Sequence, residues 1–358
     1  MPELVLDREH KGLAGVVVDE SAISDVQSTG SLIFRGHAIS ELVNWEFSEV
    51  AALVVDGQRS DELGELLKVH ANLSVKQMDH ILLLNRTTHP MRVLQGMVPL
   101  LVDEATSLDP RERGLIVAAK LPAIVAVHLT GSKVILDETL PYAERFLSAI
   151  KEESPDSVAA FNVAQILQLE HSLNAGTFAA RVVASTLADI ECAISAGIGA
   201  LSGRLHGGAD QAAIEIADSL SDQTSIQTYV KEALERGEKI PGMGHREYRV
   251  KDPRAMHLER WAERLSTGTE QEDVFNKLRM LESEIAAVMK LKGKDVHANV
   301  EFYKGVVYRS IGLPNNFFTA GFAMARVFGY VAHFLESRAD NRIFRPQARY
   351  VGADHVSA

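Results

Sequence analysis

Residues 158–203, VAAFNVAQILQLEHSLNAGTFAARVVASTLADIECAISAGIGALSG, are the most apolar stretch of the chain. Alanine is frequent in this stretch, and its small side chain lets helices pack closely. The stretch shows no sustained alternation of apolar and polar residues, which a half-buried strand would require. It therefore indicates a core of closely packed helices.

The sequence on both sides of this stretch extends the helical pattern. Apolar residues recur at three- and four-residue spacing, and one such run stops at Gly57. Only the first 40 residues are rich in β-forming residues, in GVVVDE (15–20) and SLIFRG (31–36). We predict a mainly α fold with a small N-terminal β element. The predicted helical segments are 41–57, 60–73, 90–105, 112–129, 139–153, 210–236, 253–266, 270–291 and 314–336.

Composition narrows the class of protein. The net charge is −11, which argues against a uniform basic surface for nucleic acid. No uncharged apolar run reaches membrane-spanning length, and the N-terminal MPELVLDREHKG lacks the apolar core of a secretory signal. Cys192 is the only cysteine, so an intrachain disulfide and a thiolate metal cluster are excluded, and we expect its thiol to be buried. We expect a cytoplasmic protein without nucleic-acid or membrane partners.

Cations cluster in two places despite the acidic balance. Residues 239–254 and 338–349 hold nine lysines and arginines between them, namely Lys239, Arg246, Arg249, Lys251, Arg254, Arg338, Arg342, Arg345 and Arg349. Such clusters suit a small anionic ligand, but they are also typical of solvated helix faces with paired charges. Charge alone favours the solvated faces.

Two glycine-rich loops carry histidines. They are LSGRLHGGAD (201–210) and KIPGMGHREYRVKDPRA (239–255), and glycine in such numbers indicates a close approach of the backbone to something. His171, His206 and His245 are 35 and 39 residues apart, which matches no short-range metal motif. GIGALSG has the wrong spacing for a dinucleotide fingerprint and ends an apolar helix. We predict neither a metal ion nor a nicotinamide cofactor.

Six blocks of sequence, in order along almost the whole chain, resemble the citrate synthase family. They are GLAGVVVDESAISDV with GSLIFRG, EHSLNAGTFAARVVAST, LHGGAD, PGMGHREYRVKDPRA, NVEFYKGVVYRSIGLP, and FAMARVFGYVAHFLE with RIFRPQARYVG. The resemblance implies a homodimer of two-domain helical subunits. The large domain would comprise 1–209 and 306–358, and the small domain 210–305 would close over the active site.

The resemblance also implies the reaction. Oxaloacetate would condense with an acyl-CoA, and hydrolysis of the thioester would release CoA without any cofactor. With acetyl-CoA this is the citrate-forming step of the tricarboxylic acid cycle. The clustered cations then have a purpose, since oxaloacetate is a dianion and CoA carries phosphates.

The resemblance assigns roles residue by residue. His206 matches the histidine that stabilises the thioester enolate, His245 the histidine that protonates the oxaloacetate ketone, and Glu301 stands at the position of the base. The substrate-binding positions are His171, Asn174, Arg254, Phe322, Arg326 and Arg345, of which Arg345 would reach into the partner's site. The turn that would cradle CoA comprises Ile240, Pro241, Gly242, Met243, Gly244 and Arg246.

The chain departs from the family's usual pattern around the base. The family usually has Asp in NVDFY, whereas this chain has Glu301, whose ordinary pKa is similar but whose side chain is one methylene longer. A misplacement of ~1 Å can cost ~100-fold in rate. Asp210 replaces a usual Asn, and Arg204 stands where Pro is common. An added carboxylate near His206 favours imidazolium, and we expect Arg204 to neutralise Asp210.

Three functions remain open from the sequence. The first is citrate synthase and the second is 2-methylcitrate synthase, which uses propionyl-CoA. One methylene in an acyl pocket changes discrimination by only ~1–3 kcal/mol, so the sequence does not separate these two. The third is a non-catalytic paralogue that binds oxaloacetate or CoA, in which Glu301 would have no catalytic use.

Overall fold

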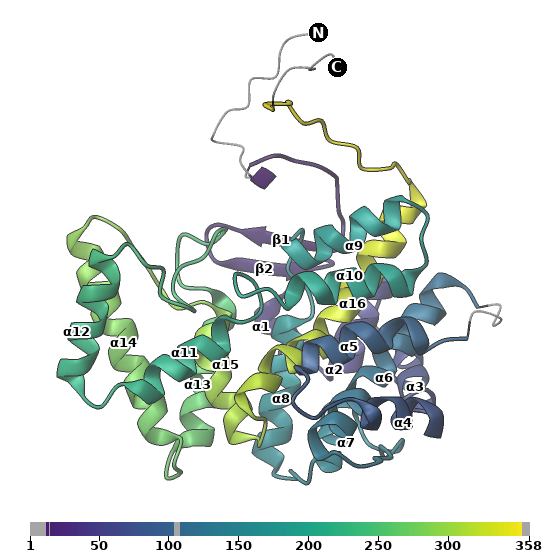
Figure 1. Cartoon of the computed structure of the whole chain (residues 1–358), viewed down its shortest axis with the longest axis horizontal. Coiled ribbons are helices and arrows are strands. Elements are labelled where there is room, and N and C mark those ends of the chain that lie inside the picture. Colours follow the sequence, from purple (N-terminus) through teal and green to yellow (C-terminus); the bar gives the residue numbers. More distant parts are fainter. Residues whose placement is uncertain (1–11, 14, 104–107, 353–358) are drawn as a thin grey trace, which may run out of the picture.

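A computed structural model of the chain describes residues 12–13, 15–103 and 108–352 (Figure 1). The N-terminal residues 1–11, on which most of the expectation about a secretory signal rests, lie outside the described residues. So does the end of the predicted large domain, 353–358.

A small antiparallel sheet precedes the helices, in the order β1-β2-β3. In β1 (Ser24–Gln27) and β2 (Ser31–Phe34), Val26 faces Leu32 across a turn, and β2 also pairs with β3 (His37–Ala38). The predicted β element at 31–36 is confirmed, but the one at 15–20 is wrong. A strand needs a pairing partner, and the turn at Gly30, whose φ is +91°, brings 24–27 rather than 15–20 alongside β2.

Helices make up most of the described chain after the sheet, which confirms the predicted fold class. Helix α2 (Phe47–Asp56) ends before Gly57 as expected, because Gly57 adopts the left-handed conformation that ends many helices. The first helices are α1 (Ile39–Leu42), α2 (Phe47–Asp56), α3 (Glu62–Val69), α4 (Val75–Leu83), α5 (Pro90–Met97), η2 (Val98–Leu100), α6 (Pro110–Thr130), α7 (Tyr142–Ala149), α8 (Pro155–Gln168), α9 (Ala175–Ser185) and α10 (Ile190–Leu201). The later ones are α11 (Ala209–Ser219), α12 (Gln223–Glu235), α13 (Pro253–Ser266), α14 (Glu272–Leu291), α15 (Val300–Ser310), η3 (Asn315–Phe317) and α16 (Phe318–Ala339).

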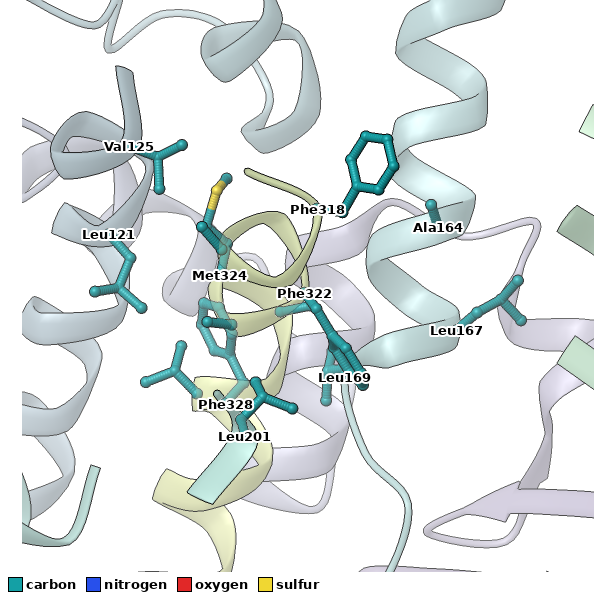
Figure 2. Packing of buried hydrophobic residues seen from close by; sticks show 14 of the residues in the cluster. Leu121, Val125, Ala164, Leu167, Leu169, Leu201, Phe318, Phe322, Met324 and Phe328 are labelled. Atoms are coloured by element: carbon teal, nitrogen blue, oxygen red, sulfur yellow. The ribbon is translucent and has the colours of Figure 1, made fainter. Parts of the chain in front are cut away.

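The core of the fold is built around α16, which packs against α2, α6, α8, α9 and α10. Figure 2 shows α16 between α6, which carries Leu121 and Val125, and the end of α8. Phe328 of α16 packs edge-on to Phe47, with 5.3 Å between the ring centroids. Burying such aromatic and aliphatic side chains is the main favourable contribution to folding.

Two segments are long and apolar enough to cross a membrane by length and composition alone, namely Pro110–Thr130 and Asn315–Ala339. In the structure 78% and 94% of their apolar windows are buried against other helices. Both segments are therefore buried among the other helices of the core.

Cys192 was expected to be buried, but it is exposed on α10. The buried face of this helix is formed by Ile190, Ile194, Ile198 and Leu201, at three- and four-residue spacing. Cys192 lies off that face because it is two residues from both Ile190 and Ile194.

Helices α11 to α15 form a second group on one side of the molecule (Figure 1), where α15 packs on α11 and α13, and α14 packs on α12. α13 and α15 also contact α8. The division into a large domain and a small domain at 210–305 remains a prediction, and residue 305 lies within α15.

Candidate active site

His171 and His245 lie side by side although 74 residues separate them in the sequence. His171 follows α8, and its ring is edge-on to that of His245, with 5.2 Å between the centroids. Its Nε2 is 3.1 Å from the hydroxyl of Tyr248. Burial lowers the pKa of His171 well below its usual value, and the positive charge of Arg254 adds to this.

The contacts of His245 define which ring nitrogen carries its proton. Nδ1 accepts the backbone N–H groups of Glu247 and Tyr248, at 3.0 Å and 3.2 Å, so in the neutral ring Nε2 carries the proton. Nη2 of Arg254 lies 3.4 Å from Nε2. Both nitrogens are hydrogen-bond donors in this tautomer. One oxygen atom of a ligand placed between them would accept from both. Burial, with help from Arg254, lowers the pKa of His245 to about 4, which keeps the ring neutral near pH 7.

His206 lies between α10 and α11 and contacts Asn174 at the start of α9. Asn174 Oδ1 accepts the backbone N–H groups of Gly176 and Thr177, which identifies it as the amide oxygen and begins the helix. His206 Nε2 lies 3.2 Å from this oxygen and donates its proton to it. Burial lowers the pKa of His206 to about 4, and the charges of Arg326 and Lys304 act in the same direction. His206 is therefore also neutral near pH 7.

Arg254 is held by Asp252 at the first turn of α13. Its Nε and Nη2 donate to the two carboxylate oxygens at 3.0 Å and 2.8 Å, and both side chains are almost fully buried. Asp252 also accepts the backbone N–H of Val300, which ties α13 to the start of α15. Burial alone would raise the pKa of Asp252, but the charge and hydrogen bonds of Arg254, together with His245, lower it. The pair remains charged, as a bidentate pair of this geometry should.

Arg326 and Phe322 lie one turn apart on α16. Arg326 is buried, its Nε donates to the carbonyl oxygen of Gln168, and its guanidinium lies 4.8 Å from the centre of the Phe322 ring. In the described part of the chain, Nη1 and Nη2 of Arg326 and Nη1 of Arg254 make no hydrogen bond to protein. Arginine donors without a protein acceptor suit a carboxylate ligand.

Glu301 lies in the first turn of α15, a helix that the sequence analysis did not predict. Asn299 begins this helix by accepting the N–H of Glu301 at 2.9 Å. The Glu301 side chain is buried, and its Oε2 accepts a hydrogen bond from Lys304 Nζ at 2.8 Å. Burial raises the pKa of Glu301 to about 7, against the opposing charge of Lys304, and Asp210 adds to the increase.

The loop at 240–246 is fastened to the segment just before Glu301. Gly244 N–H donates to His297 O at 2.7 Å, and Asn299 N–H donates to Gly242 O at 2.9 Å. Gly242 has a φ of +76°, and a Cβ there would lie 2.8 Å from the Phe302 side chain, so no other residue fits. Beside this loop is a cleft of about 410 Å³, lined among others by His245, Lys294 and His297. Of the predicted CoA residues, Ile240 is buried and Arg246 is exposed.

Arg345 is the predicted site residue that the single chain does not bring to this cluster. It is exposed in the extended segment after α16, which leaves the helical body (Figure 1), and its Nη1 donates to Pro346 O. Its predicted role in a partner's site remains a prediction.

The expected pairing of Asp210 with Arg204 is wrong. Asp210 is fully buried and lies 3.0 Å from Lys304 Nζ, whereas Arg204 is exposed. A buried carboxylate needs a partner in its own environment, and Lys304 reaches it from α15. The expected effect on His206 is also wrong, because its pKa is lowered rather than raised.

Sequence reasoning missed three residues of this cluster. Tyr248 contacts His171, Asp252 holds Arg254, and Lys304 joins Glu301 to Asp210. A signal was present for Lys304, because a Lys three residues after a Glu lies on the same helix face. It was not used because α15 was not recognised as a helix. Within the described residues, no group of three or more His, Cys, Asp and Glu side chains is placed to hold a metal ion.

Neutral histidines, unpaired guanidinium nitrogens and a buried carboxylate in a helical fold define a site for acid–base chemistry on a small anion. Comparison with known proteins identifies the family. The family model described as "Citrate synthase, C-terminal domain" matches residues 12–347. The chain belongs to the citrate synthase family and is an acyltransferase.

Curated relatives are similar over nearly their whole length. A citrate synthase of Synechocystis is 35% identical over 97% of this chain and 92% of the relative. Citrate synthase 2 of Bacillus subtilis is 34% identical, with 96% of each chain covered. A 2-methylcitrate synthase of Mycobacterium tuberculosis is also 34% identical, over 96% of this chain and 90% of the relative.

Solved structures share the fold. Citrate synthase from Thermotoga maritima superposes with a TM-score of 0.89 at 31% identity, covering 98% of this chain and 97% of that one. Citrate synthase from Thermoplasma acidophilum, in a ternary complex with carboxymethyl coenzyme A and oxaloacetate, superposes with a TM-score of 0.91 at 28% identity, with the same coverage.

Proposed function

We propose that this protein condenses oxaloacetate with acetyl-CoA and hydrolyses the resulting thioester to citrate and CoA. One observation carries the proposal. The buried carboxylate of Glu301, bound on one side by Lys304, shares the site with Arg254, whose Nη2 lies 3.4 Å from His245 Nε2, and with Arg326, whose charge helps to lower the pKa of His206. The complex of the Thermoplasma relative with carboxymethyl coenzyme A and oxaloacetate supports the choice of substrates.

Oxaloacetate would bind between the arginines and His245. Its carboxylates would accept hydrogen bonds from the guanidinium nitrogens that no protein acceptor engages. Its ketone oxygen would take the space shared by His245 Nε2–H and Arg254 Nη2, which are 3.4 Å apart. Binding would thus place the ketone carbon next to a proton donor and fix its orientation.

The reaction would begin when Glu301 removes a proton from the carbon next to the thioester carbonyl. His206 Nε2–H would hydrogen-bond the enolate oxygen, exchanging its present acceptor, Asn174 Oδ1, for the substrate. The carbon would then attack the oxaloacetate ketone while His245 donates its Nε2 proton to the oxygen. Water would finally cleave the citryl thioester, releasing citrate and CoA.

The alternative that uses propionyl-CoA is kept open by the 2-methylcitrate synthase relative, which is as similar as the citrate synthases. The non-catalytic alternative rests on Glu301 standing where Asp is usual. Both are decided by one experiment on CoA release, followed with a thiol reagent, with oxaloacetate and either thioester. The ratio of kcat/KM for the two thioesters names the reaction.

The same assay tests the base. Glu301→Gln should lower kcat by about 100-fold to 10,000-fold, because an amide cannot accept the proton, while Glu301→Asp should retain measurable turnover. Equal activity of Glu301→Gln and the unchanged protein would remove Glu301 from the mechanism. Absence of turnover with either thioester, while oxaloacetate still binds, would favour the non-catalytic alternative.

We further propose a cytoplasmic homodimer in which Arg345 of one subunit binds oxaloacetate in its partner's site. The position of Arg345 in an exposed segment that leaves the helical body supports this proposal. Mixing Arg345→Ala subunits with subunits inactivated by Glu301→Gln should restore part of the activity. Each mixed dimer would then contain one site with both residues intact, and no restoration would argue against a shared site.

A further inference from the structure

Lys304 is a fully buried lysine at the centre of the candidate site. Its Nζ lies 2.8 Å from Glu301 Oε2, 3.0 Å from Asp210 Oδ2, and 4.2 Å from the centre of the Phe322 ring. Lys304 and Asp210 are both 0% exposed. An ammonium group is buried only where opposite charges compensate for the loss of water, and here Glu301 and Asp210 provide them.

The three charged groups join two parts of the site. Lys304 follows Glu301 by three residues on α15, so both side chains lie on one helix face. Asp210 lies in the first turn of α11, four residues after His206. The contact from Asp210 to Lys304 therefore connects the loop that carries His206 with the helix that carries Glu301.

The two oxygens of Glu301 are not equivalent. Oε2 accepts the hydrogen bond from Lys304, whereas Oε1 accepts none from the residues that the structure describes. Glu has one more rotatable bond than Asp, and a held Oε2 removes the freedom that this bond adds. Oε1 is left as the oxygen that can receive a proton.

Other charged and polar groups also face this trio. Burial and the carboxylate of Asp210 make it harder for Glu301 to ionise, while Lys304 and Arg254 make it easier. The groups that surround it are Asp210 on α11, Arg254 on α13, Tyr308 on α15, Phe322 and Arg326 on α16, and His206 in the loop before α11. Neither Arg254 nor Arg326 hydrogen-bonds Glu301, so within the described chain Lys304 is the cation in direct hydrogen-bonded contact with it.

We propose that Lys304 is a positioning residue, which Asp210 anchors and which keeps Glu301 ionised and turns its Oε1 toward the carbon that loses a proton. The proposal rests on the proposed function, in which Glu301 is the base. Lys304 does not touch the reacting atoms, and it acts through the oxygen that it holds. The longer side chain at position 301 is thus combined with a cation that restricts it.

The proposal predicts opposite effects of two substitutions on the pH dependence of kcat/KM. Lys304→Met removes the cation that favours the carboxylate, so the midpoint of the acid limb should move up by about one pH unit or more. Asp210→Asn removes the opposing negative charge, so the midpoint should move down. A merely structural role of Lys304 would lower kcat without moving the two midpoints apart.

Folding is controlled with two further variants. If Lys304→Met leaves two unpaired carboxylates and does not fold, the double variant Asp210→Asn, Lys304→Met removes one of them and reports the same loss of the cation. Its acid midpoint should lie above that of Asp210→Asn alone. Lys277→Met is the matched control, because Lys277 is 12% exposed and pairs with Asp273 on α14. Its acid midpoint should equal that of the unchanged protein.

A second readout separates this proposal from the proposed function. Infrared titration of the carboxyl stretch that disappears in Glu301→Gln measures ionisation of Glu301 without turnover. If the variants turn over substrate but the acid midpoints of their kcat/KM profiles do not move, the role of Lys304 is overturned and the proposed function stands. No turnover in the unchanged protein would overturn the proposed function, and the infrared shifts would then decide the role of Lys304.

Discussion

The interior around Phe328 and the interior around Glu301 are both almost closed to water, yet they are built from opposite kinds of side chain. Phe328 on α16 is surrounded by apolar groups such as Phe47 and Tyr142. Glu301, 7% exposed, is surrounded by charged groups such as Lys304 and Asp210. The apolar region is stabilised by many interchangeable contacts, whereas each buried charge depends on one particular partner.

α16 takes part in both regions. Met324 and Phe328 pack in the apolar core (Figure 2), while Phe322 and Arg326 belong to the site. One helix therefore joins the packed core to Phe322 and Arg326 in the candidate site. This explains how Arg326 is held in place although, among the described residues, its guanidinium has a single hydrogen bond to protein, to Gln168 O.

The largest expected effect comes from removing a charge partner in the site. Asp252→Asn leaves Arg254 buried without its counter-charge, which should lower the free energy of unfolding by ~3–5 kcal/mol. It should also raise KM for oxaloacetate, because Arg254 and Val300 are no longer fixed by one carboxylate. Urea unfolding and steady-state kinetics measure the two effects.

Asp156→Asn is the control for this substitution. Asp156 pairs with Arg264 by two hydrogen bonds of 2.8 Å and 2.6 Å, but both side chains are largely exposed. Its loss should cost less than ~1 kcal/mol and leave kinetics unchanged. If both substitutions had the same effect, burial would not be what distinguishes the site.

A substitution in the apolar region should affect stability alone. Phe328→Ala should lower the free energy of unfolding by ~3–5 kcal/mol through lost burial and a cavity next to Phe47. KM for oxaloacetate, measured on the protein that remains folded, should not change. A raised KM would show that the packing around Phe328 also positions Arg326.

The smallest expected effect is a difference in acid stability between the unchanged protein and Glu301→Gln. His206 and His245 have pKa values of about 4 in place of 6.5, so the unfolded chain binds more protons between these values and stability falls as the pH falls from 6.5 to 4. Glu301 has a pKa of about 7 in place of 4.5. The folded protein therefore binds more protons between pH 7 and 4.5, and Glu301 adds stability as the pH falls through this window.

Glu301→Gln removes this opposing contribution. As the pH falls from about 8 to about 4.5, the free energy of unfolding of the variant should drop by about 3 kcal/mol relative to that of the unchanged protein. Each pKa unit corresponds to about 1.4 kcal/mol. Urea unfolding of both proteins over this range measures the difference. Parallel curves would mean that Glu301 ionises at its ordinary pKa in the folded protein.

The helices show which sequence signals sufficed. Helix 253–266 has the predicted bounds, and α6 contains the predicted 112–129. In both helices an Asp, Asp252 or Asp109, caps the first turn and the apolar spacing matches the buried face. α15 was missed because Val300 to Tyr308 are all buried, so the helix has no solvent-facing polar stripe there, and its charged residues Glu301 and Lys304 face the site instead. The helix that carries Glu301 was therefore one that periodicity did not predict, and α4 (Val75–Leu83) was another.

The sequence by itself determined the mainly α fold and the family. These follow from apolar spacing and from motifs whose residues are close along the chain. Only the tertiary structure decided that Asp210 pairs with Lys304 rather than Arg204, that His206 donates to Asn174, and that His171 contacts Tyr248. The reason is physical: these partners are 94, 32 and 77 residues apart, and the energy of a buried charge or hydrogen bond depends on geometry that local sequence does not contain.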